Sequence, residues 1–149
     1  MQDFQFKDKY DAYDLVKIMQ LLRAPGGCPW DAEQTHQSIK KNLIEETYEV
    51  IEAINKDDKA LMCEELGDLL MQVVFHAQME QEAGNFDFGD VTDGVCKKLI
   101  ERHPHVFGEV EVSGVGDVLN NWDAIKRRSK GQKKGSEPML SIPRELPAL

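Results

Sequence analysis

Long apolar runs, paired cysteines and excess positive charge are all missing from this chain of 149 residues. No apolar run approaches the roughly 20 residues that a membrane-spanning helix needs, so we expect no contact with a membrane. The three cysteines, Cys28, Cys63 and Cys96, are widely spaced and form no CxxC pair, which favours reduced thiols over a disulfide framework or a zinc site. The start, MQDFQFKDKYDAYD, lacks the apolar segment of a secretory signal, so we expect a cytoplasmic protein.

The charge balance is acidic, because 18 Lys and Arg residues stand against 27 Asp and Glu residues and the net charge is -9. This excess disfavours binding of a long polyanion through bulk electrostatics and therefore argues against nucleic acid as a partner. A small anion can still bind locally if a metal ion screens the acidic residues near it. The length and the 41% hydrophobic content are typical of one globular domain.

Helical periodicity dominates the sequence, and no segment shows a convincing strand pattern. Four or five helices are predicted, at residues 10–23, 35 or 38 to 55, 58–82, 90–102 and 118–128, with a loop at 24–34. Because the connections are short, we predict an all-α fold, an antiparallel helical bundle in which the second and third helices form a hairpin. Residues 1–130 are expected to form this domain, and residues 131–149, which hold three prolines, a C-terminal tail or connector.

Two pairs of acidic residues carry the strongest chemical signal. Glu46 and Glu49 are three residues apart on the second predicted helix, and Glu65 and Asp68 are three apart on the third. This spacing places each pair on one helix face, offset by roughly 4.5 Å along the axis. Four carboxylates facing each other across the hairpin would repel without a cation, and oxygen-only ligands favour a hard ion such as Mg2+ or Mn2+. Glu45 offers a fifth carboxylate, either as a further ligand or as a base that holds a water molecule.

Acidic residues at helical spacing often form a solvated face, and Lys41 is placed to pair with Glu45 four residues later. Asp68 fits that explanation poorly, because it interrupts an apolar run and has no basic residue within a turn. Burying an unpaired carboxylate costs several kcal/mol. Gly67 beside it costs about 1 kcal/mol in a helix interior, which favours close approach of another group at this point. The two pairs together favour a metal site.

Four strings resemble MazG-type nucleoside triphosphate pyrophosphohydrolases over nearly the whole chain, from about Leu15 to Leu149. They are GGCPWDAEQTHQSIKKNLIEETYEVIEAI, EELGDLLMQVVFHAQM, KKLIERHPHVFGEV and NWDAIKR. The resemblance implies the all-α fold of that family, a homodimer, and Mg2+-dependent hydrolysis of a nucleoside triphosphate to a monophosphate and pyrophosphate, as in nucleotide-pool housecleaning. It also implies that the metal ligands are Glu46, Glu49, Glu65 and Asp68, with Glu45 as an accessory carboxylate.

The resemblance is to the N-terminal half of two-domain MazG proteins, because the chain holds one such domain and ends in SIPRELPAL, a segment similar to a connector. The alternative is therefore a weakly active or non-catalytic half of a larger pyrophosphohydrolase, one that binds metal and dimerises. Base preference, sugar preference, the number of metal ions, the phosphorus atom attacked and the general base are not encoded in these motifs.

An anionic substrate also needs positive groups. Lys98 and Arg102 lie four residues apart on the fourth predicted helix, and the resemblance implies that they contact phosphate, although a solvated helix edge is the alternative. Trp122 and Lys126 share a face of the last helix, where an indole can stack on a base and an ammonium can reach a phosphate. Trp122 also suits a core position. Trp30, in the CPWD segment, is either a loop anchor or part of a nucleotide pocket.

Two other classes of protein compete with this interpretation. A di-iron carboxylate bundle also uses Glu pairs on antiparallel helices, but it needs Glu-x-x-His motifs, and neither acidic pair is followed by His at that spacing. A helical interaction module would use the basic stretch 126–134 to contact a partner, and the acidic net charge makes nucleic acid the weaker choice for that partner.

Overall fold

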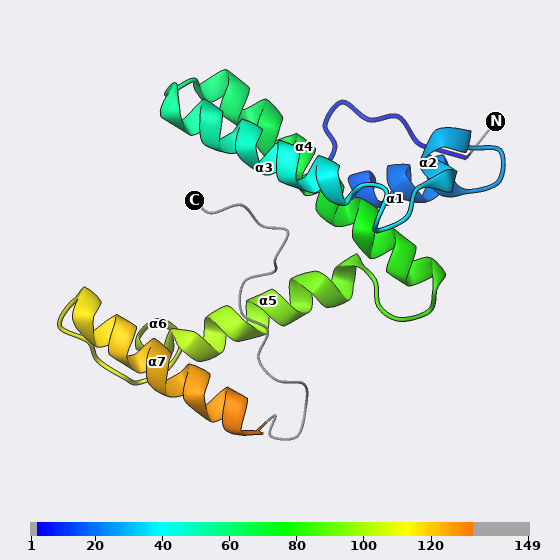
Figure 1. The fold of residues 1–149 in the computed structure, drawn as a ribbon. Helices are drawn as coiled ribbons and strands as arrows, with labels where there is room; N and C mark the ends of the chain where they lie inside the picture. The colour runs from blue at the N-terminus through cyan, green and yellow to red at the C-terminus, as the bar shows by residue number, and fades with distance from the viewer. Residues whose placement is uncertain (1–2, 133–149) are drawn as a thin grey trace. The chain divides into compact units, whose positions relative to one another are not determined.

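The computed structural model describes residues 3–132, and within them helices are the only regular secondary structure. The described helices are α1 (Ala12–Arg23), α2 (Pro29–Glu33), α3 (Lys40–Asn55), α4 (Lys59–Glu82), α5 (Phe88–Arg102), α6 (Pro104–Phe107) and α7 (Val115–Gln132) (Figure 1). The predicted all-α fold is confirmed. Among the described residues, no helix combines the length and the apolar content needed to cross a membrane.

The chain divides into two compact units, with the division between Val91 and Thr92. The first unit holds α1 to α4 and the start of α5, and the second holds the rest of α5 with α6 and α7. The expected domain at residues 1–130 stays a prediction, and most of the expected tail, residues 133–149, lies outside the described residues.

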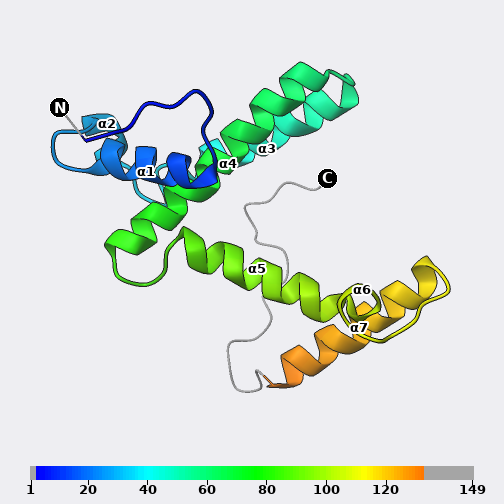
Figure 2. The ribbon, with the colours of Figure 1, turned by 180° about the vertical axis from the view of Figure 1, so that it is seen from behind.

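The α3–α4 pair forms the predicted hairpin, and the two helices lie side by side when viewed from either side (Figures 1 and 2). The turn between them contains Asp57, whose φ of 52° lies in the left-handed region that Asp tolerates better than most residues. Asp58 then caps α4, because its side chain accepts a hydrogen bond of 3.1 Å from the Leu61 backbone N. Local turn and capping chemistry thus joins the two helices that carry the acidic pairs.

The core of the first unit is built mainly on the second half of α4. This half supplies Val74, Phe75, Ala77 and Met79, which pack with Met19 of α1 and with Ile39 and Phe88; all are buried. The first half of α4, which carries Glu65 and Asp68, packs along α3 instead. The acidic pairs therefore lie on a helical hairpin, and the second half of its helix α4 is held by the core.

The segment between α1 and α3 is not the plain loop that the sequence predicted, because Pro29–Glu33 forms the short helix α2. Its proline occupies the first helical turn, where a missing N–H costs little. The preceding turn requires glycine twice: Gly26 has φ of 84°, and a Cβ on Gly27 would collide with the carbonyl oxygens of Leu21 and Leu22.

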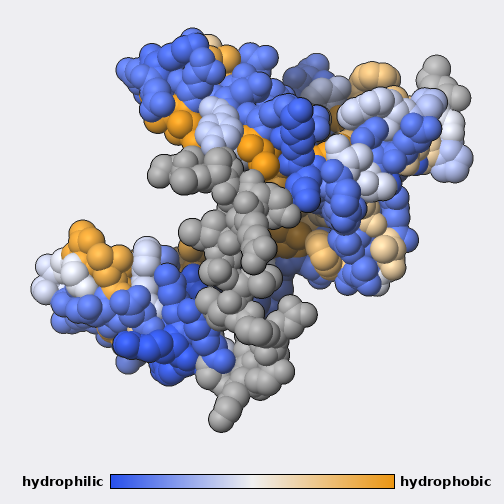
Figure 3. All heavy atoms as spheres, viewed as in Figure 1, coloured by the Kyte–Doolittle hydropathy of each residue, from blue (hydrophilic) through white to orange (hydrophobic). Residues whose placement is uncertain are grey.

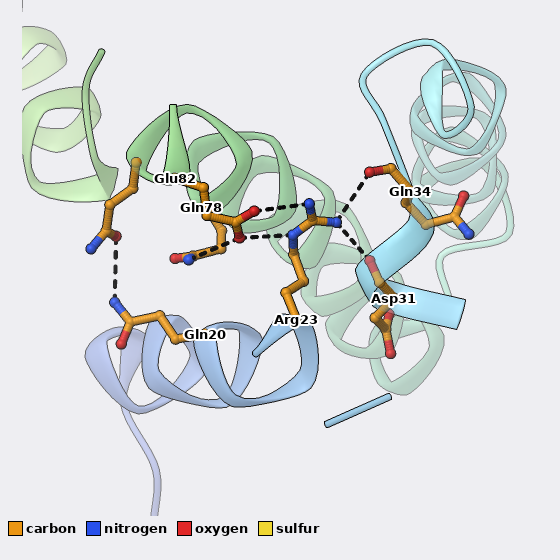
Figure 4. Close-up of polar contacts among 7 residues, drawn as sticks. Gln20, Arg23, Asp31, Gln34, Gln78 and Glu82 are labelled. Carbon is orange, nitrogen blue, oxygen red and sulfur yellow. Dashed lines mark hydrogen bonds and ion pairs between the residues drawn. The ribbon is translucent and has the colours of Figure 1, made fainter. Parts of the chain in front are cut away.

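Arg23 ties this segment to both α1 and α4 (Figure 4). Its Nε and Nη2 donate to the two carboxylate oxygens of Glu82 at 2.9 and 3.0 Å, and its Nη1 donates to the backbone oxygens of Asp31 at 2.6 Å and Gln34 at 3.1 Å. The guanidinium also lies 5.6 Å from the centroid of the Phe75 ring. The hydrogen bond from Arg23 lowers the pKa of the Glu82 carboxyl below its usual range. One side chain therefore fixes three segments of the first unit.

Candidate metal centre

Four carboxylates converge where α3 faces α4. Glu46 and Glu49 come from α3, Glu65 and Asp68 come from α4, and one oxygen of each lies within 4.8 Å of one oxygen of every other. The i, i+3 spacing places each pair on one face of its helix, and the hairpin brings the two faces together. The structure thus brings together the four residues that the sequence singled out as metal ligands.

The cluster is partly withdrawn from solvent, since Glu46, Glu65 and Asp68 are half-buried and Glu49 is exposed. The Oε2 atoms of Glu46 and Glu65 are buried, and neither has a hydrogen-bond partner among the described residues. Buried polar atoms nearly always find a partner in a protein, a water molecule or an ion. These two oxygens are therefore the observation that points to a ligand at this position.

Mutual repulsion shifts the protonation of the cluster. The pKa of Glu65 is raised to about 7, first by a hydrogen bond with Glu49 that the protonated carboxyl makes, and then by burial and by the negative charges nearby. The pKa of Glu46 is also raised, chiefly by burial and next by the charge of Glu49. Without a cation, the cluster thus tends to hold a proton near neutral pH, and a bound cation would remove that tendency.

The donor set fits a hard divalent cation. All four groups offer carboxylate oxygen, the ligand that Mg2+ and Mn2+ prefer, and the cluster contains no His or Cys that would suit a softer metal. Glu45 is exposed and lies outside this group of four, although its negative charge contributes to the raised pKa of Glu46. A Cβ placed on Gly67 would meet no atom within 4 Å among the described residues, so the space beside it is open.

Residues 34–107, which include all four carboxylates, match the MazG nucleotide pyrophosphohydrolase domain family. The chain belongs to the MazG family. It is 49% identical over 136 residues to the nucleoside triphosphate pyrophosphohydrolase of Escherichia coli (strain K12), with 91% of this chain and 52% of that protein covered. It is 48% identical over 141 residues to the Thermotoga maritima nucleoside triphosphate pyrophosphohydrolase/pyrophosphatase MazG, with 89% and 54% covered. The uncharacterized protein YabN of Bacillus subtilis (strain 168) is 51% identical over 134 residues, with 89% and 27% covered.

A solved structure supports the MazG fold. The crystal structure of a mazG-related protein from Thermotoga maritima matches with a TM-score of 0.65 and 28% sequence identity, covering 77% of this chain and 98% of that one. The chain spans about half the length of the E. coli and T. maritima pyrophosphohydrolases, at 52% and 54%. The MazG match therefore establishes the family and the fold of this region.

The remaining candidate residues fall in both units. Trp30 lies in α2 with 57% of its surface exposed, outside the matched MazG residues. Lys98 and Arg102 lie one turn apart on α5 and inside the match, with Lys98 exposed and Arg102 half-buried. Trp122 and Lys126 do meet on α7, where Nζ lies 6.0 Å from the indole centroid. The substrate-binding roles of these five residues stay predictions.

The structure also contains a histidine pair, His36 and His76, that the sequence did not predict. The Nδ1 atoms of His36 and His76 are 2.7 Å apart, the rings are stacked, and His36 Nε2 contacts Glu80 Oε1 at 2.8 Å. The Nε2 of His76 is buried without a hydrogen-bond partner among the described residues. Burial, followed by the charge of His36, lowers the pKa of His76. The two histidines are 40 positions apart, so no local spacing in the sequence signals their contact.

Proposed function

We propose that this chain hydrolyses nucleoside triphosphates or deoxynucleoside triphosphates to the monophosphate and pyrophosphate, as a cytoplasmic enzyme of nucleotide-pool housecleaning. The observation that carries the proposal is the convergence of four carboxylates in a MazG domain, with buried oxygens of Glu46 and Glu65 that lack a partner among the described residues. The names of the E. coli and T. maritima relatives supply the reaction class.

In this proposal, Glu46, Glu49, Glu65 and Asp68 hold Mg2+, and Mn2+ suits the same oxygen donors. When bound, the ion would supply positive charge to the phosphate oxygens and help to ionise a water molecule. The reaction adds water across the bond between the α and β phosphoryl groups, so that one bridging P–O bond breaks and a proton is released.

The other candidate residues have distinct tasks in this proposal. Glu45, exposed beside the cluster, accepts the proton of the attacking water. Lys98 and Arg102 bind the phosphates, because cations one turn apart on a helix can hold adjacent phosphoryl groups. Trp30 and the Trp122–Lys126 pair serve the nucleotide, since an indole presents a flat face for stacking on a base.

The proposal includes a homodimer. Leu66, Leu70 and Val73 are exposed on α4 and follow the four- and three-residue spacing of a single stripe. Apolar surface is visible along the α3–α4 hairpin in Figure 3. A second copy of the chain, pairing its own α4 with this stripe, would remove both surfaces from water at once, and such isologous contacts are the commonest in soluble oligomers.

A second candidate function is a weakly active or non-catalytic half of a larger pyrophosphohydrolase. The observation that favours it is length, because the chain covers only 52% of the E. coli relative. Such a half would still bind metal through the four carboxylates and dimerise, but it would depend on another segment for turnover.

The test is to incubate the purified chain with a panel of nucleoside and deoxynucleoside triphosphates plus Mg2+ and to separate the products. Monophosphate with pyrophosphate, lost on addition of a chelator, is the expected result. No turnover at high enzyme concentration, while Mg2+ still raises the melting temperature, would favour the second candidate. Release of orthophosphate with the diphosphate would contradict the proposed reaction.

A further inference from the structure

Gln72 is a polar residue in an apolar part of α4. Its surface is only 4% exposed, and its Oε1 is buried with no hydrogen-bond partner among the described residues. Its neighbours along the helix include Met71, Val73 and Val74, which are all apolar. A Met or Leu of similar size would fill the same space without leaving a buried oxygen unpaired, so the amide needs an explanation.

The position of Gln72 on α4 relates it to the acidic cluster. It follows Asp68 by four residues and Glu65 by seven, so the three side chains lie on one helix face. Side chains on a helix lean toward its N-terminus and cover the preceding turn. From this lean we expect the Gln72 carboxamide to reach toward the turn that carries Asp68, and its Oε1, like the Oε2 of Glu65, is buried without a hydrogen-bond partner among the described residues.

We infer that Gln72 is a further residue of the metal site, whose Oε1 accepts a hydrogen bond from a water molecule held by the ion at the four carboxylates. This inference rests on the metal site of the proposed function. Mg2+ keeps several of its waters in proteins, and each of them has O–H groups to donate. An amide oxygen accepts such a bond without adding a fifth negative charge to a cluster that already holds four carboxylates. Gln72 is thus a positioning residue for the ion.

Gln78 provides a matched comparison on the same helix. It is 8% exposed, and its Oε1 is also buried without a partner among the described residues. Its Nε2, however, donates to Glu82 at 3.1 Å, and it follows Asp68 by ten residues, about 15 Å along the helix axis. Gln78 therefore shares the residue type, the burial and the unpaired oxygen of Gln72 but not its place beside the cluster.

The experiment measures Mg2+ affinity directly, by calorimetric titration of the metal-stripped full chain. Gln72→Met should weaken Mg2+ binding about tenfold or more, the range found when residues that support metal ligands are removed. Gln78→Met should leave the Kd within about twofold of the wild-type value. Gln72→Glu should bind Mg2+ more tightly than Gln72→Met, because it keeps an oxygen acceptor at the same reach. If Gln72→Met does not fold, Gln72→Leu is measured with the same expectation.

The outcomes separate this inference from the proposed function. If Gln72→Met binds Mg2+ within twofold of wild type while Asp68→Asn loses binding, Gln72 is a core residue and only this inference is overturned. Equal weakening by Gln72→Met and Gln78→Met would also overturn it, because the loss would then reflect general damage to α4. If the wild-type chain binds no Mg2+, both the inference and the proposed metal site fail.

Discussion

Replacing Arg23 by Met should destabilise the first unit, because this one side chain holds α1, the segment around α2 and the end of α4 together. Met keeps most of the apolar stem but removes all four hydrogen bonds that the guanidinium donates to Glu82, Asp31 and Gln34. It also removes a donor from two part-buried backbone oxygens, of which the oxygen of Asp31 keeps only a long hydrogen bond of 3.4 Å from Gln34 N.

The magnitude follows from the burial of each partner. Arg23 has a side chain that is 9% exposed, whereas that of Glu82 is 40% exposed, so solvent screens much of the ion pair. A hydrogen bond from a charged donor contributes about 1.5–3 kcal/mol when it is well buried, and a screened pair contributes about 0–1 kcal/mol. The two carbonyl contacts are only part-buried, so we take each at the low end of this range and the screened pair near zero, which gives an expected loss of about 3 kcal/mol, a large fraction of the stability of a small unit.

The assay is urea denaturation followed by far-UV circular dichroism, compared between wild type and Arg23→Met. Gln20→Met is the control, because Gln20 contacts Gln81 between the same two helices through a single exposed hydrogen bond of 3.4 Å and should change stability little (Figure 4). A loss below about 0.5 kcal/mol for Arg23→Met, or one equal to that of the control, would refute the reasoning.

The same pair of proteins gives a pH test. The pKa of Glu82 is lowered in the folded state, so its pairing with Arg23 stabilises the fold above the ordinary pKa of a glutamate. This contribution is lost as the pH falls through the lowered pKa. The stability difference between wild type and Arg23→Met should therefore shrink on acidification, and a difference that grows would contradict the ion pair.

Three further predictions concern α4 and α5. Asp68→Asn should abolish Mg2+-dependent turnover and leave the helical circular dichroism unchanged, whereas Glu64→Gln, an exposed residue outside the cluster, should retain both; turnover by the Asp68 variant sinks the site assignment. In the absence of metal, the free energy of unfolding of the wild type should fall relative to that of Glu65→Gln as the pH rises to about 7. The reason is that the raised pKa of Glu65 favours the folded, protonated form at lower pH. Urea melts that give parallel pH profiles for the two proteins would contradict this. Gly67→Ala should raise the free energy of unfolding by about 0.5–1 kcal/mol, as should Gly94→Ala, because a Cβ at either position meets open space; a loss at Gly67 alone would show that another molecule approaches α4 there.

The long helices could be predicted because their apolar spacing reports the faces that become buried. The short ones could not, because tertiary contacts hold them. α2 begins at a proline after a glycine turn, and its far end is held by the hydrogen bond from Arg23 to Gln34, a contact that no local pattern encodes. Pro104 shows both effects of a proline on helices. α5 ends at Arg102, shortly before it, as the predicted helix 90–102 does, but Pro104 also begins the short helix α6, which the sequence did not predict.

The acidic pairs could be predicted from spacing, because both pairs and the hairpin that joins them are local features of the chain. The His36–His76 contact joins residues 40 positions apart and depends on how the segment before α3 packs on α4, so spacing alone could not reveal it. Gln72 was missed for another reason: a single polar residue in an apolar run is informative only once its oxygen is known to be buried and unpaired.

The surroundings of α4 differ from one side of the helix to the next, which is why its apolar pattern is hard to interpret from the sequence. One face carries Glu65, Asp68 and Gln72, and the buried core residue Val74 lies on the opposite side of the helix. The exposed stripe that begins at Leu66 lies on a third side, so apolar residues occur around most of the helix instead of along one face. A helix that is apolar on several sides needs several partners, and the first unit provides two of them, α1 and α3. The carboxylates interrupt this apolar surface where α3 brings matching acids, and this is why we propose a metal site at Asp68 and a second copy of the chain on the exposed stripe.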